Sequence, residues 1–509
     1  MATLHYFDRY LRHFLGHFHD EADAITAAAR ARGFATRIYF VPVADPAMVA
    51  AFGGTTIPLP ETAPEPGVDP IRYAAARMEQ GWRALGPDPF APGDVLFLSS
   101  LRPGELVGIC HFLATLPPGR RPATVLRIYD GDAFVEPGAR ALAGRAALWR
   151  RAMAEIADIP CPPILASETP ALARAATRIL GRRVLDLPIP VAFDAEPAAG
   201  PGPSAWEDRT SPRVLFICHR RGIAVADLAR CLARIRTARP DASLLVKLND
   251  FKSIMHVREH AYITRTLAVP VLTEFLPRAA LSRLMAEADL VVLPYRVGGY
   301  EFRSSGPFAE AAAIGRPTVI PVRTWMAAEM DAGRGAGMIY ADDRPEVIAG
   351  ATVAAIGRLD ALQRRAAIAA AAARRTHGPD RFVLRLLDLA REAAAGGARA
   401  DGIALGTVVG FDALGDGYRL LGEGWGAAGV LDTPIAASRA RLCATIDGIA
   451  PAPSALNIAV ELAGPPAGSA PCRVTLRAGT NEAATWVVEA GSVGWHRATL
   501  AAPVDGRRL

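Results

Sequence analysis

The segment "DLVVLPYRVGGYEFRSSGPFAEAAAIGRPTVIPV", residues 289–322, contains a complete strand–loop–helix–strand unit. Its first and last parts, 289–295 and 316–322, are short apolar runs of the length of a buried strand. Between them, an alanine-rich stretch follows "SSGP", small residues and a proline that favour a helix start. Because neither run alternates between polar and apolar residues, the unit predicts a parallel sheet covered by helices.

The same pattern extends on both sides of this unit, from 213 to 375. Short apolar runs alternate there with amphipathic stretches of helical length, as in repeated βα units. We therefore predict a Rossmann-like domain over 205–398, with closing helices at its end. Its other expected strands are 213–218, 243–248, 269–275 and 335–340.

Residues 1–195 show a looser version of this pattern and predict an N-terminal Rossmann-like domain. The text "FDAEPAAGPGPSAWEDRTSP" at 193–212 is rich in Pro, Gly and Ala without periodicity, which indicates a linker. Two α/β domains joined in this way predict a ligand cleft between them, at the carboxyl ends of strands. The expected strands are 37–43, 94–100, 124–130, 162–167 and 183–191.

The pattern changes after residue 403. Short alternating segments separated by Gly, Pro and Ser turns predict an antiparallel β-sandwich over 403–509. Trp425, Trp486 and Trp495 are either core aromatics of this sandwich or a surface on which a carbohydrate stacks.

Composition narrows the class of protein. The chain of 509 residues is 51% hydrophobic, which is enough for several packed domains. Its six cysteines form no CxxC pair, a pattern typical of a reduced, cytosolic protein without a disulfide framework. The N-terminus has no signal-peptide pattern, and no apolar run reaches the length of a membrane span. The net charge is +6, and the basic residues are interspersed with acidic ones, so we expect no nucleic-acid partner. This charge is compatible with an anionic substrate or an anionic membrane surface.

The loop and helix start at 303–310 predict a grip for a diphosphate and a ribose. Small residues let a phosphate approach the backbone N–H groups at the positive end of the helix dipole. The guanidinium of an arginine and the serine hydroxyls can donate hydrogen bonds to the phosphates. A carboxylate one turn further into the helix can accept hydrogen bonds from two ribose hydroxyls. A well-capped helix with one acidic residue is the alternative. The candidate residues are Arg303, Ser304, Ser305, Gly306, Pro307 and Glu310.

This region resembles the donor-binding region of bacterial GT-B glycosyltransferases of the group that includes family 4. The resemblance rests on "FLPRAALSRLMAEADLVVLPY" and "EAAAIGRPTVIP" and covers about 205–380 well. It implies a GT-B fold, a nucleotide diphosphate sugar as co-substrate, no other cofactor and no metal. It also assigns Glu310 to the donor ribose. The family's usual earlier glutamate is absent: Phe302 stands at its position and Glu301 one residue away.

Three further cations are candidates for the donor diphosphate. The family places an arginine after the first strand of the second domain, which Arg220 or Arg221 in "FICHRRG" matches. Lys247 ends the next strand at the same sheet edge, in a chain whose one other lysine is Lys252. A lysine at this place either supplies a compact positive charge to the diphosphate or forms an ion pair at the protein surface.

The first domain offers two candidates for acid–base work on the acceptor. His17 follows a glycine after the first strand-like segment, where the family has a glycine-rich loop, and a histidine there could take the acceptor proton. Asp130 opens a "DGD" that follows an expected strand. It is a plain turn, an acceptor-side group, or a metal-binding pair as in GT-A enzymes.

The sequence thus predicts a cytosolic glycosyltransferase, free or at the inner face of the membrane. It would transfer a sugar to a hydroxyl of a surface glycan, a lipid-linked sugar or a protein. A nucleotide-sugar epimerase of similar fold and a non-catalytic glycan-binding protein are the alternatives.

Overall fold

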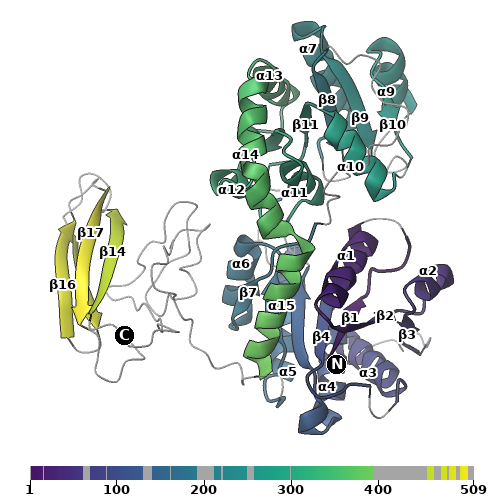
Figure 1. Cartoon of the computed structure of the whole chain (residues 1–509), viewed down its shortest axis with the longest axis vertical. Helices are drawn as coiled ribbons and strands as arrows, with labels where there is room; N and C mark the ends of the chain where they lie inside the picture. Colours follow the sequence, from purple (N-terminus) through teal and green to yellow (C-terminus); the bar gives the residue numbers. More distant parts are fainter. Residues whose placement is uncertain are drawn as a thin grey trace. The chain divides into compact units, whose positions relative to one another are not determined.

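The structure, a computed structural model, falls into two compact units, Met1–Gly397 and Ala398–Leu509 (Figure 1). In the first unit it describes residues 2–14, 17–60, 69–86, 89–129, 140–160, 162–191, 211–218, 222–248, 257–274, 276–297 and 300–394. In the second unit it describes 455–463, 472–478, 481–488 and 493–501.

The first unit contains two parallel sheets, as the sequence predicts. The first sheet has the strand order β3-β2-β1-β4-β5-β6-β7, so β1 and β4 are neighbours at the point where the order reverses. Its strands are β1 (Thr3–Asp8), β2 (Ala35–Phe40), β3 (Thr55–Thr56), β4 (Val95–Ser100), β5 (Ala123–Ile128), β6 (Ile164–Ser167) and β7 (Val184–Asp186). The helices between them are α1 (His17–Ala31), α2 (Pro46–Ala51), α3 (Pro70–Arg83), α4 (Pro103–Thr115), η1 (Pro118–Arg120), α5 (Arg140–Glu155) and α6 (Pro170–Leu180).

The second sheet has the order β10-β9-β8-β11-β12-β13. Its strands are β8 (Arg213–Cys218), β9 (Ser243–Leu248), β10 (Val271–Leu272), β11 (Leu290–Val292), β12 (Thr318–Pro321) and β13 (Gly337–Tyr340). Each coincides with or lies inside one of the six runs expected from the sequence. The helices are α7 (Val225–Ala238), α9 (Val257–Ala261), η3 (Tyr262–Thr266), α10 (Arg278–Glu287), α11 (Gly306–Ala313), α12 (Trp325–Asp331), α13 (Pro345–Ile356), α14 (Leu359–His377) and α15 (Pro379–Ala394).

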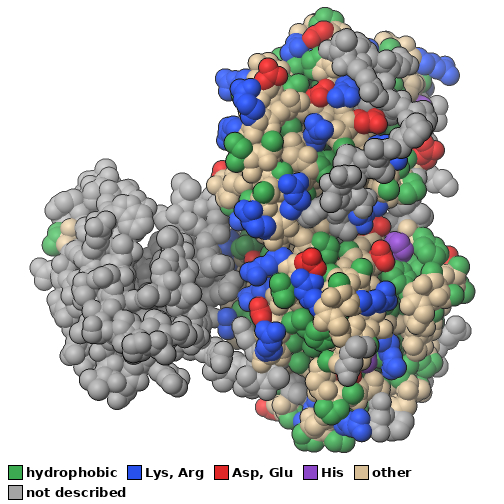
Figure 2. Space-filling view, in the orientation of Figure 1, with side chains coloured by type: hydrophobic (Ala, Val, Ile, Leu, Met, Phe, Trp, Pro, Cys, Tyr) green, Lys and Arg blue, Asp and Glu red, His purple; other side chains and the backbone are tan. Residues whose placement is uncertain are grey.

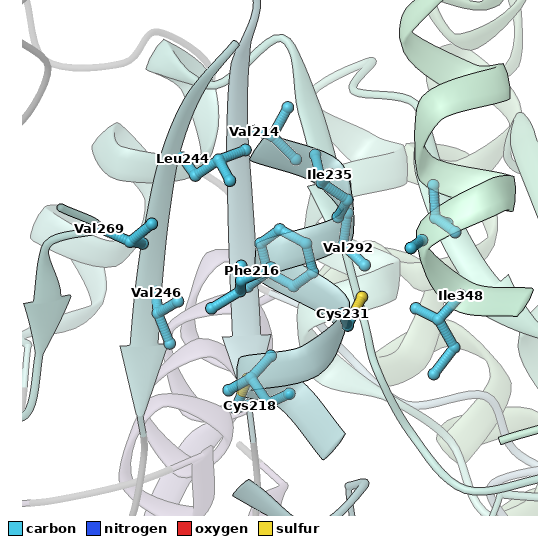
Figure 3. Packing of buried hydrophobic residues seen from close by; sticks show 14 of the residues in the cluster. Val214, Phe216, Cys218, Cys231, Ile235, Leu244, Val246, Val269, Val292 and Ile348 are labelled. Carbon is cyan, nitrogen blue, oxygen red and sulfur yellow. The ribbon is translucent and has the colours of Figure 1, made fainter. Parts of the chain in front are cut away.

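Both faces of the second sheet are covered, which explains why its strands are continuously apolar. Figure 3 shows one core, in which Phe216 of β8 and Val246 of β9 pack toward Ile235 of α7. The opposite face carries Leu215 and Leu245, which pack with α10 and α11. Alternate residues of one strand therefore face different helical layers.

Helix α15 departs from the expected domain boundaries. The sequence places it within the 205–398 domain, but its apolar residues belong to the core of the first sheet, and it packs against α1 and β5 (Figure 1). Phe382, Val383, Leu386 and Ala390 form one apolar stripe on this helix. The spacing predicts an amphipathic helix, but it does not show which sheet the stripe covers.

The chain also crosses between the sheets earlier than the expected limit at residue 195. Ile189 already lies in the core of the second sheet. The Val191 N–H donates to the His377 carbonyl at 2.7 Å, so the outgoing and returning crossings are hydrogen-bonded to each other. His377 is itself held by Glu329 of α12 at 3.0 Å.

The second unit contains antiparallel strand pairs, β14 (Ala455–Ala463) with β17 (Val493–Ala501) and β15 (Cys472–Ala478) with β16 (Asn481–Val488). These pairs agree with the expected antiparallel class, and the full β-sandwich over 403–509 remains a prediction. Trp425 and the side chains of Trp486 and Trp495 lie outside the described residues.

Over the described residues, none of the helices combines the length and apolar character that crossing a bilayer requires. On the face shown in Figure 2, Lys and Arg side chains are scattered among acidic and apolar ones. This agrees with the interspersed charges of the sequence.

Candidate functional site

The loop between β11 and α11 lies at the carboxyl edge of the second sheet and is held from several sides. The Tyr295 and Tyr300 rings stack with their centroids 4.3 Å apart. The Tyr300 carbonyl accepts the Trp325 N–H at 3.1 Å, and the Val297 N–H donates to Asp343 at 2.6 Å. The described residues of the loop, up to 297 and from 300, are therefore held in place before any ligand binds, which lowers the entropy cost of binding.

The start of α11 is built as the sequence predicts. Ser305 is the N-cap, and its hydroxyl accepts the Phe308 N–H at 3.3 Å. Pro307 has no N–H, so the Gly306 N–H remains as the first-turn donor that can point to a ligand. A Cβ placed on Gly306 would meet no described atom within 4 Å. The helix start thus combines a backbone donor that needs no capping partner from its own turn with space beside Gly306.

Glu310 is buried inside this helix and is only 7% exposed. The sequence suggests a carboxylate off the apolar face, but residues 308–313 of α11 are all buried. The Ser282 hydroxyl of α10 donates to the Glu310 carboxylate. A carboxylate in this position can serve a ligand or can simply tie α10 to α11, and a substitution at Ser282 separates these roles.

Lys247 is also buried, with 2% of its surface exposed. Its ammonium donates to the Leu248 carbonyl at 2.7 Å. It lies two residues after Leu245, so it faces the same layer of the molecule as α10 and α11. Burial lowers the pKa of Lys247, and the Glu274 charge opposes this shift. An anion beside the ammonium would favour its charged form.

The carboxyl edge of the first sheet holds a buried charged cluster that the sequence reading missed. The Arg127 guanidinium on β5 lies 2.6 Å from the Glu21 carboxylate of α1 and donates to the Ser99 hydroxyl at 2.6 Å. Asp8, at the end of β1, accepts from the Ser100 hydroxyl and from the Tyr10 N–H. We call Asp8, Glu21 and Arg127 the carboxylate–arginine cluster.

The cluster holds more acidic groups than its arginine can neutralise. Burial raises the pKa of Glu21 to about 7, against the opposing charge of Arg127. Burial also raises the pKa of Asp8, and hydrogen bonds from Ser100 and Tyr10 oppose it. The sequence did carry a signal, because Arg127 is a lone charge in an otherwise apolar strand and a buried charge requires a partner.

The edges of the two sheets meet at the β11–α11 loop. Glu168, directly after β6, accepts the Ser304 N–H at 3.3 Å. The hydroxyl of Thr169, the N-cap of α6, donates to the Phe302 carbonyl at 3.2 Å. Burial raises the pKa of Glu168, while the charges of Arg127 and Arg303 and hydrogen bonds from Ser304 oppose it. The loop of the second domain therefore joins the polar edge of the first.

Comparison with known proteins places this geometry in a known fold. A glycosyltransferase structure from Rickettsia africae superposes with a TM-score of 0.55 at 10% identity, covering 77% of this chain and 98% of that one. A sucrose-phosphate synthase from Thermosynechococcus elongatus gives 0.54 at 10% identity, covering 78% of this chain and all of the other. The chain shares the fold of solved GT-B glycosyltransferases.

An Escherichia coli structure described as trehalose-6-phosphate, bound with UDP-2-fluoro glucose, has the same GT-B fold. Its TM-score is 0.53 at 12% identity, and the match covers 77% of this chain and 99% of that one. No protein-family model and no curated protein matches the sequence. The likeness therefore concerns the two-sheet fold, and chemistry must be argued from the residues of this chain.

Within the GT-B fold, some of the predicted site residues lie in the described part of the chain and others do not. Residues 303–307 and Glu310 form one continuous loop and helix start, and Lys247 lies on the same side of the sheet as α11. Arg220, Arg221 and Asp130 lie outside the described residues. His17 is the first residue of α1, and its side chain is likewise outside the described part.

Proposed function

We propose that the chain is a glycosyltransferase of the group-1, family 4 type. It moves a sugar from a nucleotide diphosphate sugar to a hydroxyl of a surface glycan, a lipid-linked sugar or a protein. The observation that supports this proposal is the β11–α11 loop, which presents a helix start with open space beside Gly306, near a buried carboxylate. The protein works in the cytosol or at the inner face of the membrane.

In this proposal the second domain binds the donor. The diphosphate lies against the start of α11, where Arg303 and Gly306 supply a guanidinium and a backbone N–H. Lys247 and either Arg220 or Arg221 add positive charge. Glu310 accepts from the ribose hydroxyls, and the partner it now has, the Ser282 hydroxyl, is a group of the same kind.

These groups lower the barrier because negative charge develops on the leaving diphosphate during transfer. Fixed cations and a helix start stabilise that charge without reorganising. Approach of the two domains around the donor also excludes water that would otherwise hydrolyse it. The protein supplies the positive charge itself, so the proposal requires no metal cofactor. Transfer should persist in excess chelator, and loss of activity that manganese restores would contradict this point.

The first domain binds the acceptor in this proposal, with His17 or Asp130 as the group that takes the proton from the acceptor hydroxyl. The carboxylate–arginine cluster lies where β1 and β4 end, at the reversal of strand order. In open α/β sheets, ligands bind outside this point. We therefore expect the acceptor to bind outside this edge of the first sheet.

Titration calorimetry of the full chain with nucleoside diphosphates and nucleotide sugars tests the donor site. Glu310→Gln should weaken nucleotide-sugar binding by about 10- to 100-fold, as expected for a charge-assisted hydrogen bond of ~1.5–3 kcal/mol. Ser282→Ala is the matched control, because it removes the tie to α10 and keeps the carboxylate. Equal losses in the two variants would show that Glu310 acts through packing.

A product assay separates transfer from the alternative reactions. With donor and a mixture of acceptor glycans, the proposal expects a glycosylated product and release of nucleoside diphosphate. Conversion of the donor sugar to its epimer without any acceptor would show that the protein is an epimerase and not a transferase.

A further inference from the structure

The contact between β6 and the β11–α11 loop involves a buried carboxylate. Glu168 is 4% exposed and accepts the Ser304 N–H at 3.3 Å. Thr169 binds the same loop two residues earlier, at the Phe302 carbonyl. These bonds join segments more than 130 residues apart in the chain. The first domain therefore holds the loop directly before the start of α11.

The groups that Glu168 engages are those that the proposed donor site assigns to phosphate. Carboxylate and phosphate oxygens are both anionic acceptors, and both favour backbone N–H, hydroxyl and guanidinium donors. Ser304 supplies a backbone N–H. Burial raises the pKa of both Glu168 and Tyr129, and the charge of Arg303 opposes both shifts. Glu168 thus accepts from a donor that a bound anion would use.

A donor phosphate and the Glu168 carboxylate would repel each other if both remained at Ser304 and Arg303. A second cation, Arg127, also opposes the rise that burial causes in the pKa of Glu168. Arg127 belongs to the first domain and also neutralises Glu21. A carboxylate that leaves the loop can therefore keep a counter-charge on its own side.

We infer that Glu168 is a positioning residue that occupies the Ser304 N–H, beside Arg303, in the ligand-free protein and is displaced by the diphosphate of the donor. This inference rests on the proposed function, since it takes the loop as the phosphate grip. Its consequence is that donor affinity depends on both domains. Binding of the diphosphate breaks the hydrogen bond between Glu168 and Ser304, so the donor changes one contact between the domains.

The test compares Glu168→Gln with the unchanged chain by calorimetry, with a nucleoside diphosphate and the corresponding nucleoside as ligands. Glutamine keeps an oxygen that can accept from Ser304 but carries no charge. The inference expects about tenfold tighter binding of the diphosphate, the gain from removing one competing charged acceptor. Nucleoside binding should not change. Unchanged or weaker diphosphate binding by the glutamine variant would overturn the inference.

Arg303→Ala separates this inference from the proposed function. If Arg303→Ala weakens diphosphate binding but Glu168→Gln has no effect, the phosphate grip stands and the displacement is wrong. If Arg303→Ala leaves diphosphate binding unchanged, the loop is not the grip and both proposals fail. The double variant should show little of the gain seen in Glu168→Gln alone. It lacks the Arg303 guanidinium, which is one of the groups that the phosphate would gain.

A second substitution keeps the test decisive if Glu168→Gln folds poorly. Glu168→Asp retains the charge but shortens the side chain, which withdraws the carboxylate from Ser304 and leaves it near Arg127. The inference expects an intermediate gain in diphosphate affinity, about threefold. Weaker binding in a folded Glu168→Asp chain, checked by circular dichroism, would show that the contact supports the grip and does not compete for it.

Discussion

The carboxyl edges of the two sheets use charge in opposite ways. The second sheet presents a capped helix start, small residues and one buried lysine, Lys247, whose ammonium donates to a backbone carbonyl. The first sheet buries an arginine together with Glu21 and Asp8; Arg127 forms an ion pair with Glu21, and the charge of Asp8 also acts on Arg127. The first edge is therefore expected to need its charges for folding, whereas the second is expected to need them for a ligand. Substitutions that remove charge from each edge can test this difference.

The largest effect is expected from Arg127→Met. The change leaves the Glu21 and Asp8 carboxylates in the protein interior without their shared cation, which typically costs ~3–5 kcal/mol. The thermal unfolding midpoint should fall by roughly 10 °C, measured by circular dichroism. Adding Glu21→Gln to this variant should recover part of the loss. A midpoint within about 2 °C of the unchanged chain would show that the cluster does not stabilise the fold.

Lys247→Met should give the opposite pattern. Methionine fills the same space without a buried charge, so the unfolding midpoint should stay the same or rise. Nucleoside diphosphate binding should weaken by about 10- to 100-fold, the loss of a charge-assisted contact, while nucleoside binding stays unchanged. Calorimetry measures both ligands. An equal loss of affinity for both ligands would show that Lys247 does not contact the phosphates. A large loss of stability would show that the second edge, like the first, needs its charge for folding.

The pH dependence of stability should sharpen the comparison at the first edge. Burial raises the pKa of Glu21 to about 7 from 4.5, so the folded chain binds a proton that the unfolded chain has released between these values. Glu21 therefore contributes stability at low pH that is lost as the pH rises from about 4.5 to 7.

Chemical unfolding at pH 5 and at pH 7 measures this contribution. The fall in stability between the two pH values should be smaller in Glu21→Gln than in the unchanged chain, by roughly 1–3 kcal/mol. Glu329 acts at lower pH, because hydrogen bonds from Arg334 and His377 outweigh burial and lower its pKa to about 2. Its contribution is lost as the pH falls below about 4.5, outside the tested interval. Equal slopes in the two chains would mean that Glu21 is ionised throughout.

The smallest effect is expected from removing the second unit. Both sheet edges lie within Met1–Gly397, so a chain that ends at residue 398 should bind nucleoside diphosphate with an affinity within about threefold of the full chain. Calorimetry and circular dichroism of the shortened chain check this. A folded fragment without diphosphate binding would show that residues after 398 complete the donor site.

Local pattern was sufficient for the elements of the second sheet and for the helix start. Six apolar runs predicted β8 to β13, because strands buried on both faces must be continuously apolar. Ser305 and Pro307 predicted the start of α11, because capping depends on neighbours three residues apart. The donor roles of Lys247, residues 303–307 and Glu310 remain predictions that the experiments above address.

Only the tertiary structure decided which distant segments meet. The stripe of α15 was readable as amphipathic, yet its place on the first sheet depends on a chain crossing fixed by Val191 and His377. Arg127 and Glu21 come from separate elements, as do Glu168 and Ser304. Long-range pairing of charges leaves no periodic trace in a sequence, because burial and distance, and not spacing along the chain, determine which buried charges can neutralise each other.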